Sequence, residues 1–377
     1  MANTLTNLIP DVYAALDVVS RESVGAIPGV SRDAKADRLA TGQTLRVGQT
    51  PTNTTATFTP SMAVPSAIDQ TIANSSLTLS KNKYAGFSWT GEEEYAMDQG
   101  QGFLSIQQGQ IAQAFRVLVN EMENDVCDAI ALGASRAYGT AGTTPFASTL
   151  ADSAQVRKIL DDNGAPASGR SLVINTSAGA ALRTLGQLTK ANEAGTSMTL
   201  RDGELLNLHG FSIRESAQIN NATAGTGASY LINEASGYAV GSTSLTLDTG
   251  TGTILAGDII TIGSNKYVVK TALAANVVVI EAPGLVAAVA NNDTVTVNAT
   301  SARNIAFSSD ALVLATRLPI FPKQGDLAID NEIITDPRTG ISFDLRVYPG
   351  DGMVLYRIHA LWGFKALKPA HAAIMLG

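Results

Sequence analysis

Cysteine and histidine are scarce in this chain of 377 residues, which holds one cysteine and three histidines. A single cysteine, Cys127, excludes a disulfide within the chain and a zinc site built from cysteines. It falls in a helical pattern, where a small buried thiol needs no functional role. The three histidines, His209, His359 and His371, lack the spacing of a metal-binding motif, and we expect them to be packing or interface residues.

Charged side chains are also few, because Asp, Glu, Lys and Arg make up 16% of the chain against roughly 25% in soluble domains. The 26 basic and 33 acidic residues leave a net charge of −7. Without a basic stripe, the sequence argues against tight electrostatic binding of nucleic acid. A protein surface with few charged side chains is poorly protected against association. We therefore expect other copies of the chain to cover much of the surface of this protein.

Leader and anchor signals are missing from the beginning of the sequence, MANTLTNLIPDVYAALDVV. It has neither a basic leading region nor a long apolar run, so it predicts no signal peptide and no membrane anchor. We therefore expect a protein that is made, and kept until assembly, in a cytoplasm.

Enzyme motifs are absent as well, since the sequence has no nucleophile elbow, phosphate-binding loop, full GxGxxG or HExxH. One stretch, LTLDTGTGT at 245–253, resembles the Asp-Thr-Gly of aspartic proteases. That chemistry needs a second carboxylate to share a proton, and the later flap motif is missing at the expected distance. We interpret Asp248, Gly250 and Gly252 as a hairpin turn, and predict no enzyme, metal or cofactor.

The strongest pattern that is present predicts a helix over about 103–134. Apolar side chains recur there at steps of three and four residues and form one face over some five turns: Ile111, Phe115, Leu118, Met122 and Val126. We predict that this face packs in the core. The acidic side chains beside it, Glu121, Glu123, Asp125 and Asp128, predict a solvated or partner-facing side. Shorter helices are predicted over 10–23 and 152–163, and one with a Thr/Ser cap within 171–188.

Extended structure is predicted before the long helix. Residues 25–66 have no helical period and contain four prolines and many threonines. A loop of this length is uncommon inside a compact domain, so we predict an arm and an extended hairpin that lie on another surface. Residues 71–95 would supply the return strand, because Leu77 and Leu79 alternate and Trp89 follows.

A stretch from about 222 to 300 has a β pattern alone, with turn signals about every eight to twelve residues. It predicts an inserted barrel or sandwich, after which mixed signals resume beyond Arg303. The chain ends in IHALWGFKALKPAHAAIMLG at 358–377, apolar to the last residue. Chain ends are usually polar and frayed, so this tail predicts burial.

The order of these segments resembles the major capsid protein of tailed double-stranded-DNA phages, whose architecture is the Hong-Kong-ninety-seven fold. In both, a helix and arm precede an extended loop at about 48–90, the long spine helix, an α/β domain and a terminal β-segment. The insertion between RDGELLNLHGFSIRESAQI and ARNIAFSSDALVLATRLP is similar to that of the P-twenty-two-type coat proteins. The ending YRIHALWGFKALKPAHAAIMLG resembles the last strand and tail of that group.

This resemblance implies an α+β chain with a small inserted all-β domain that is barrel-like. Its parts would be an N-terminal helix and arm (1–47), an extended loop hairpin (48–100), a spine helix and peripheral domain (101–150), an axial α/β domain (151–221), the inserted β domain (222–300), and a return to the axial and peripheral domains with the C-terminal strand (301–377). The tail would end in the core or in a seam between subunits.

The function that the resemblance implies is a structural shell protein of the virion. Hundreds of copies, as hexamers and pentamers, would form an icosahedral head in the host cytoplasm, without a membrane or a cofactor. A separate scaffolding protein would assist a precursor shell that matures as double-stranded DNA is packaged without sequence-specific contact. A portal protein and a possible decoration protein would be further partners.

Contacts between subunits are implied for the arm and the loop. The candidate side chains are Leu45, Val47, Phe58, Leu77, Leu79 and Trp89. The sequence departs from the family at the tight turn GSNK (263–266), where the P-twenty-two type extends a long loop that contacts a two-fold neighbour, so we do not expect that contact here. Lys81 and Lys83 lie in the expected loop, but we interpret them as solubilising residues rather than as crosslinking lysines.

Two alternatives remain open from the sequence. The bias toward Thr, Gly and Ala with little cysteine also fits a β-rich surface adhesin or a carbohydrate-binding module, although the long helix and the missing export signal argue against it. An encapsulin-type nanocompartment shell would share the fold but normally lacks the insertion.

Overall fold

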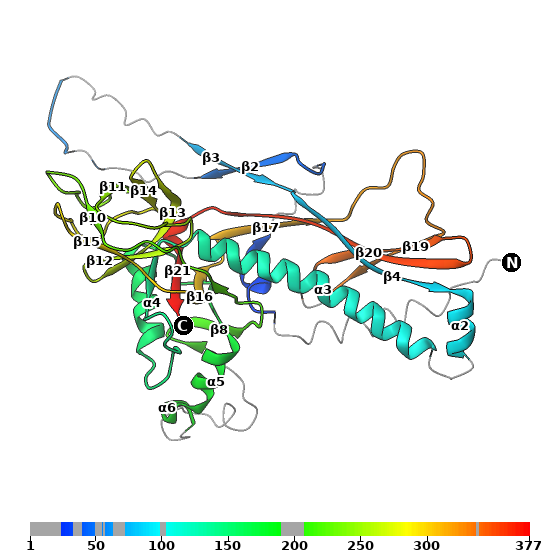
Figure 1. Ribbon diagram of the computed structural model, residues 1–377. Coiled ribbons are helices and arrows are strands. Elements are labelled where there is room, and N and C mark those ends of the chain that lie inside the picture. The colour runs from blue at the N-terminus through cyan, green and yellow to red at the C-terminus, as the bar shows by residue number, and fades with distance from the viewer. Residues whose placement is uncertain are drawn as a thin grey trace.

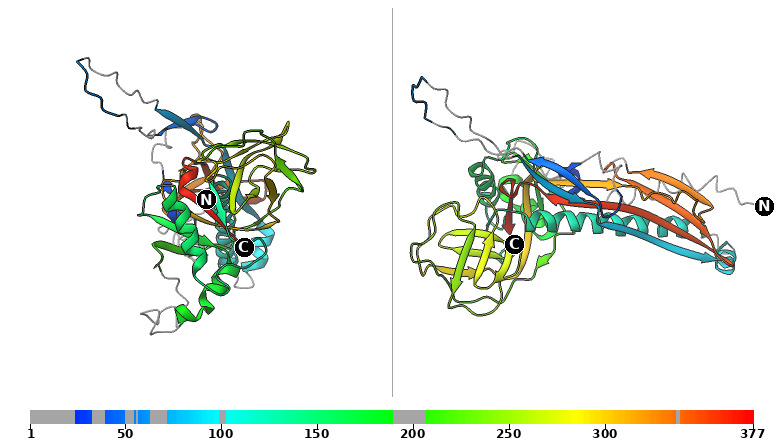
Figure 2. Two further views of the ribbon diagram at one scale, coloured as in Figure 1. Left: turned by 90° about the vertical axis from the view of Figure 1, so that its left-hand side faces the viewer. Right: turned by 90° about the horizontal axis from the view of Figure 1, so that it is seen from above.

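The computed structural model describes residues 24–32, 40–49, 55, 57–62, 72–98, 103–189, 207–336 and 339–377. The helix predicted over 10–23 lies outside the described residues. The described part is elongated, with a long helix along a long sheet and a β-rich unit at one end (Figure 1). A two-stranded hairpin stands off this body (Figure 2).

The first sheet has six strands and forms the long axis of the molecule. Its order is β1 (Ser31–Arg32), β17 (Leu312–Arg317), β20 (Met353–Ala366), β19 (Ser342–Pro349) and β18 (Asp330–Thr335), with β4 (Lys81–Thr90) paired to β20. Helix α2 (Gly91–Asp98) follows β4, and helix α3 (Phe103–Leu132) then runs back along one face of the sheet (Figure 1). The helix predicted over 103–134 is therefore present.

Strand β4 corrects the sequence prediction for the hairpin. It pairs with β20 from Lys81 opposite Trp362 to Thr90 opposite Met353, whereas the return strand of the hairpin is β3 (Ala73–Thr78), paired with β2 (Thr44–Gln49). The physical reason is burial, because alternate side chains of β4, among them Phe87, pack against the core under α3.

A second, 13-stranded sheet carries the rest of the fold. One part of it, whose strands we call the axial strands, consists of β5 (Arg136–Tyr138), β21 (Ala372–Leu376), β16 (Ser301–Ser308), β6 (Arg170–Ile174), β8 (Phe211–Glu215) and β7 (Asn207–Leu208), with β9 (Asn221–Ala222) paired to β16. Helices α4 (Ala151–Asp162), α5 (Thr176–Thr184) and α6 (Gly186–Thr189) accompany it. The 3-10 turns are η1 (Ile27–Gly29) and η3 (Pro369–His371).

The cap of α5 differs from the sequence prediction. The N-cap is Asn175 rather than a Thr or Ser, and its side chain accepts a hydrogen bond from the amide of Ala178. Helix α4 ends at Asp162, and Gly164 beyond it has a positive φ of 73°, which is the helix end that the sequence predicts.

The segment between β9 and β16 folds into a closed barrel. Its strands are β10 (Tyr230–Ile232), β11 (Ser244–Asp248), β12 (Ile259–Ile262), β13 (Asn265–Ala274), β14 (Val277–Ile280) and β15 (Thr294–Val297). The order β12-β15-β10-β11-β14-β13 closes because β12 also pairs with β13, and the interior is a separate apolar core. The barrel is joined to the axial strands where Tyr267 lies opposite Arg136.

The apolar tail becomes a central strand. β21 lies between β16, to which it is antiparallel, and β5, to which it is parallel. All five of its side chains are buried, so the tail ends in the core of its own chain.

Candidate interaction surface

Much of the described hairpin is exposed. β2 and β3 pair from Thr44 opposite Thr78 to Gln49 opposite Ala73, and neither strand pairs with another sheet. Beyond the last pair, Phe58 is 82% exposed, and Met62 and Ile72 are also exposed. Two strands alone are marginally stable in water, so this hairpin is suited to lie against a second surface.

The root of the hairpin is held by the body. Leu77 and Leu79 are fully buried against Val313, Ala315 and Leu361. On β17 and β20 these partners alternate with side chains that face α3, so the root covers the opposite face of the sheet.

Three of the six contact residues predicted from the sequence are thus not available to a partner. Leu77 and Leu79 belong to the core just described, and Trp89 is 8% exposed in a cluster with Val347 and Tyr356. The reason is that 73–90 lies across and within the sheet instead of in a free loop. Leu45 and Val47 are half-buried, and Phe58 is exposed.

The long face of α3 lies against the core of the six-stranded sheet. All five of its side chains are buried: Ile111, Phe115, Leu118, Met122 and Val126. Phe115 meets Phe343 of β19 edge to face, with 5.3 Å between ring centroids, a favoured geometry for aromatic pairs.

Glu123 corrects the expectation of a solvated acidic side on α3. It is buried, and its carboxylate accepts hydrogen bonds from the amides of Gly25 (2.7 Å), Ala26 (2.7 Å) and Ile27 (2.9 Å). It therefore fixes the segment 24–32, which we call the strap, to the middle of the long helix. Sequence reasoning missed this role.

A signal for Glu123 was present in the sequence. It lies on a second buried line of α3, formed with Val119, Cys127 and Ile130, so it is an acid within an apolar stripe. Burial together with the Glu123 and Asp128 carboxylates raises the pKa of the Cys127 thiol well above its usual value, which keeps the thiol protonated.

Two other acidic side chains of α3, Asp125 and Glu121, hold β4. Lys81 pairs with Asp125 at 3.4 Å, and Lys83 pairs with Glu121 at 3.3 Å. Asp125 also accepts a hydrogen bond of 2.9 Å from Nε1 of Trp362. Both lysines lie in β4 rather than in a free loop, and their partners are within the chain.

A second exposed apolar surface lies on the connection 318–329 between β17 and β18. Arg346 holds this connection, because it donates to the carbonyl of Pro319 (2.9 Å), lies 3.4 Å from the carboxylate of Asp326 and stacks 3.9 Å above the ring of Phe321. Tyr348 donates a further bond of 2.8 Å to Asp326. The large apolar side chains exposed on this connection are Ile320, Phe321, Leu327 and Ile329.

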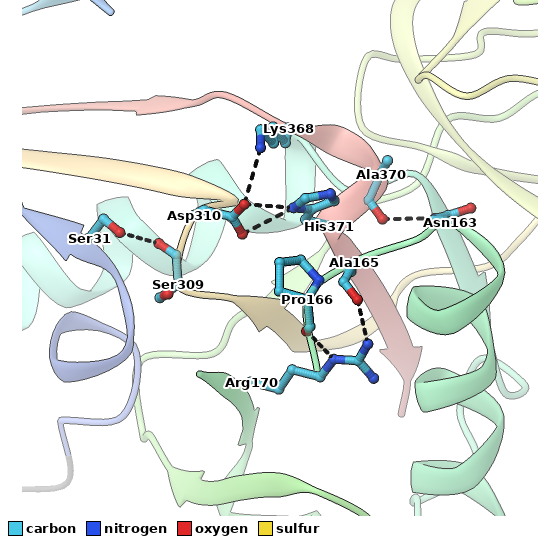
Figure 3. A network of polar contacts seen from close by, with 10 residues as sticks. All are labelled: Ser31, Asn163, Ala165, Pro166, Arg170, Ser309, Asp310, Lys368, Ala370 and His371. Atoms are coloured by element: carbon cyan, nitrogen blue, oxygen red, sulfur yellow. Dashed lines mark hydrogen bonds and ion pairs between the residues drawn. The ribbon is translucent and has the colours of Figure 1, made fainter. Parts of the chain in front are cut away.

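The histidines are engaged in packing and local contacts. His371 lies 2.9 Å from Asp310, which also pairs with Lys368 at 3.3 Å (Figure 3). These contacts tie η3 to the turn between β16 and β17. His209 Nδ1 lies 2.9 Å from the hydroxyl of Ser153. The ring of His359 lies 5.6 Å from that of Tyr84, tilted by 37°. Burial with the charges of Arg346 and Arg357 lowers the pKa of His359.

No catalytic or metal arrangement is found among the described residues. Asp248 ends β11 and its carbonyl accepts a bond from Gly250 in a turn, and Gly252 has a positive φ of 87°. No group of three metal-ligating side chains occurs in the parts of the chain given above. No helix among them is long and apolar enough to cross a membrane.

Comparisons with known proteins find likeness at the level of three-dimensional structure only. No family model matches the chain, and neither does any curated protein. A structure from Mycobacterium phage Che8 shares 13% identity over 94% of this chain and 91% of the other, with a TM-score of 0.49. The capsid of cyanophage P-SCSP1u shares 12% over 94% and 88%, with a TM-score of 0.48. A virus-like particle from Pyrococcus furiosus shares 10% over 98% and 100%, with a TM-score of 0.46.

Proposed function

We propose that this chain is a major capsid protein of a tailed phage, which assembles with many copies of itself into a closed shell. The observation that carries this proposal is the hairpin, whose root is buried in the body while Phe58, beyond its last strand pair, is 82% exposed. An apolar side chain of this size, presented on an extended arm, gains free energy when a neighbour covers it.

The order of parts supports the same function. A hairpin, a 30-residue helix on a long sheet, an axial domain and an inserted barrel follow one another along the chain, as the resemblance to the Hong-Kong-ninety-seven fold implies. The shell would be icosahedral, built from hexamers and pentamers, and part of the virion. Assembly in the host cytoplasm would use a separate scaffolding protein and a portal protein, with a decoration protein as a further possible partner.

The net charge of the chain is more typical of a shell that encloses DNA than of a protein that binds nucleic acid. With a net charge of −7, the chain would repel the phosphates of packaged DNA, so the enclosed double-stranded DNA would make no sequence-specific contact with the wall. The DNA would then be held by closure of the shell as the precursor matures.

Negative-stain electron microscopy of the purified chain, after size-exclusion chromatography, tests the proposal. We expect shells, curved sheets or tubes, either directly or after addition of molecular crowders. A stable small oligomer that never polymerises would contradict the proposal and favour the adhesin or carbohydrate-binding alternative. A shell that co-purifies with a cargo enzyme would favour the nanocompartment.

A matched pair of variants tests the role of the hairpin end. Phe58→Ala should raise the concentration needed for assembly about tenfold, since buried aromatic residues dominate interface energies. The neighbouring Thr57→Ala is also exposed and should change that concentration less than about twofold, because it removes little apolar surface. Equal effects of the two variants would exclude Phe58 as the contact.

A further inference from the structure

The inserted barrel is attached to the rest of the chain through a narrow support. It stands beside the end of α3 (Figure 2). β13 pairs with β5 over two residue pairs, which involve Lys266 and Tyr267 of the barrel. The next bond across this junction runs from the amide of Val268 to the carbonyl of Ser135 and is 3.4 Å long, which exceeds the usual range for such bonds. A ladder this short holds the barrel in place but resists its rotation weakly.

One loop of the barrel, residues 255–258, makes a second contact, with α3. Gly257 has a positive φ of 85°, and a Cβ built on it would lie 2.3 Å from Cδ2 of Leu132 at the end of α3. Arg303 of β16 donates a hydrogen bond to the carbonyl of Gly257. The loop therefore approaches the helix so closely, and in such a conformation, that only glycine is tolerated at this position.

Hollows lie on both sides of this contact. Leu132 and Ala256 line a hollow of about 290 Å³ and also one of about 570 Å³. The smaller hollow extends to Asp128 of α3, and the larger one extends to Lys365 of β20. A small rotation of the barrel about the loop would therefore meet empty space instead of close-packed side chains. Such a rotation closes one hollow as it opens the other.

The larger hollow is lined by a buried carboxylate that lacks a full set of partners. Glu281 follows β14 and is 7% exposed. Its Oε2 atom accepts no hydrogen bond and lies 3.4 Å from Nζ of Lys270, whose side chain is 56% exposed. A buried carboxylate oxygen without a hydrogen bond has lost its hydration without full compensation. Glu281 therefore favours any rearrangement that brings a further donor to it.

Lys365 lines the same hollow from the body of the molecule. Its side chain is exposed, and no ion pair joins it to another described residue. A lysine presents three donors at the end of a flexible four-carbon stem. Lys365 is thus a donor that Glu281 can gain when the larger hollow closes.

We infer that the barrel turns on its support between two positions, of which this structure shows the open one. In the closed position the larger hollow is shut, and Glu281 pairs with Lys365. We call this ion pair the latch. A hydrogen bond between two charged groups is stronger than a neutral one, and the walls of the closed hollow would shield it from water. Both residues belong to one chain, so the inference does not depend on the proposed function.

Hydrogen exchange of the Val268 amide, which bonds across the junction, tests the latch in the full chain. Glu281→Gln should accelerate this exchange about tenfold, and Lys365→Met should do the same, because either change removes the latch. The double variant should exchange no faster than either single variant, since the two residues act as a unit. Lys368→Met is the control. Lys368 pairs with Asp310, so its loss should change the exchange less than about twofold.

Two results of the exchange experiment would overturn the inference. In the first, Lys365→Met leaves the exchange unchanged, or its effect simply adds to that of Glu281→Gln. In the second, Lys270→Met reproduces the effect of Glu281→Gln while Lys365→Met does not, because Lys270 is the ion-pair partner of the open position. Near-ultraviolet circular dichroism verifies that each variant is folded.

Cysteine trapping tests the closed position by an independent route. A disulfide forms when two Cα atoms come within about 7 Å of each other. Glu281→Cys with Lys365→Cys should form one, under mild oxidation, about tenfold faster than Ser264→Cys with Lys365→Cys. Ser264 lies in the exposed turn between β12 and β13 and does not line the larger hollow. Equal rates for the two pairs would overturn the inference.

Discussion

Two buried or half-buried carboxylates show how single residues position the parts of this chain. Glu123 ties the strap to α3 through three amides, and Asp310 ties η3 to the turn between β16 and β17. In each case the acid joins segments that are far apart in the sequence. Hydrogen bonds to a charged acceptor are stronger than neutral ones. Both residues are therefore good targets for testing how the strap and η3 are held in place.

Replacing Glu123 by glutamine should loosen the strap. The amide nitrogen of glutamine cannot accept a bond, so at least one of the three amides loses its partner at a cost of about 1.5–3 kcal/mol. Hydrogen exchange of the amides of Gly25, Ala26 and Ile27 should accelerate at least tenfold, as measured by mass spectrometry. Glu121→Gln, two residues away on the same helix, is the control and should leave their exchange unchanged. Unchanged exchange in both variants would mean that Glu123 does not hold the strap.

Asp310 should make stability depend on pH in the acid range. Burial would raise its pKa, but hydrogen bonds from His371, Ser308 and Lys368, together with the charge of His371, outweigh burial and lower it below the ordinary 3.8. A carboxyl whose pKa is lower in the folded state contributes stability above its unfolded pKa and loses it as the pH falls through the folded pKa.

Unfolding by urea at several pH values measures this contribution. The difference in free energy of unfolding between the unchanged chain and Asp310→Asn should shrink as the pH falls below about 4. Asp351→Asn, on the exposed turn between β19 and β20, is the control. A difference that does not change with pH would show that the Asp310 carboxylate makes no such contribution.

At the scale of elements, the hairpin and β4 show what local pattern leaves open. Alternation at Leu77, Leu79 and Trp89 predicted strands correctly, but it could not say which strands would pair. Pairing was decided by the burial each strand could reach, which for β4 is the core under α3 and for β3 is the opposite face of the sheet.

Shortening the hairpin should separate folding from assembly. Gln49 and Ala73 lie opposite each other, so Asn-Gly in place of residues 50–72 gives a two-residue turn of a favoured type. The buried root is kept, and the thermal midpoint of the monomer should shift by no more than about 4 °C, which corresponds to roughly 1 kcal/mol. Assembly seen by electron microscopy should be lost. Normal shells from the shortened chain would contradict the assembly role of the hairpin.

At the scale of the whole molecule, three parts each have an apolar cluster: the sheet under α3, the strands β5, β21, β16, β6 and β8 with their helices, and the barrel. The barrel closes on itself through the pairing of β12 with β13, so its hydrogen bonds are largely internal. Two connections join it to the rest of the chain. One is the pairing of β9 with β16, and the other is the pairing of Tyr267 with Arg136. The last contact extends the axial sheet into the barrel, which the sequence did not indicate.

Residues 222–300 expressed alone should fold into this barrel. A closed sheet without free edges around a separate core retains its main stabilising interactions when it is cut out. Circular dichroism should show β structure and a cooperative thermal transition. A featureless melt would mean that the barrel depends on its junction with β5.

The sequence by itself determined the local elements with a strong period: the long helix with its buried face at Ile111–Val126, the α4 helix that ends before Gly164, and the β character of 222–300. The periodicity of apolar residues shows which side of a helix or strand is apolar. That side is the same in every fold in which it is buried. Only the tertiary structure decided which partner each apolar side meets. It moved Leu77, Leu79 and Trp89 into the core, placed the tail between β5 and β16, and gave Glu123 three amides to bind. These outcomes depend on contacts between residues far apart in the chain, and local patterns carry no information about which distant residues will meet.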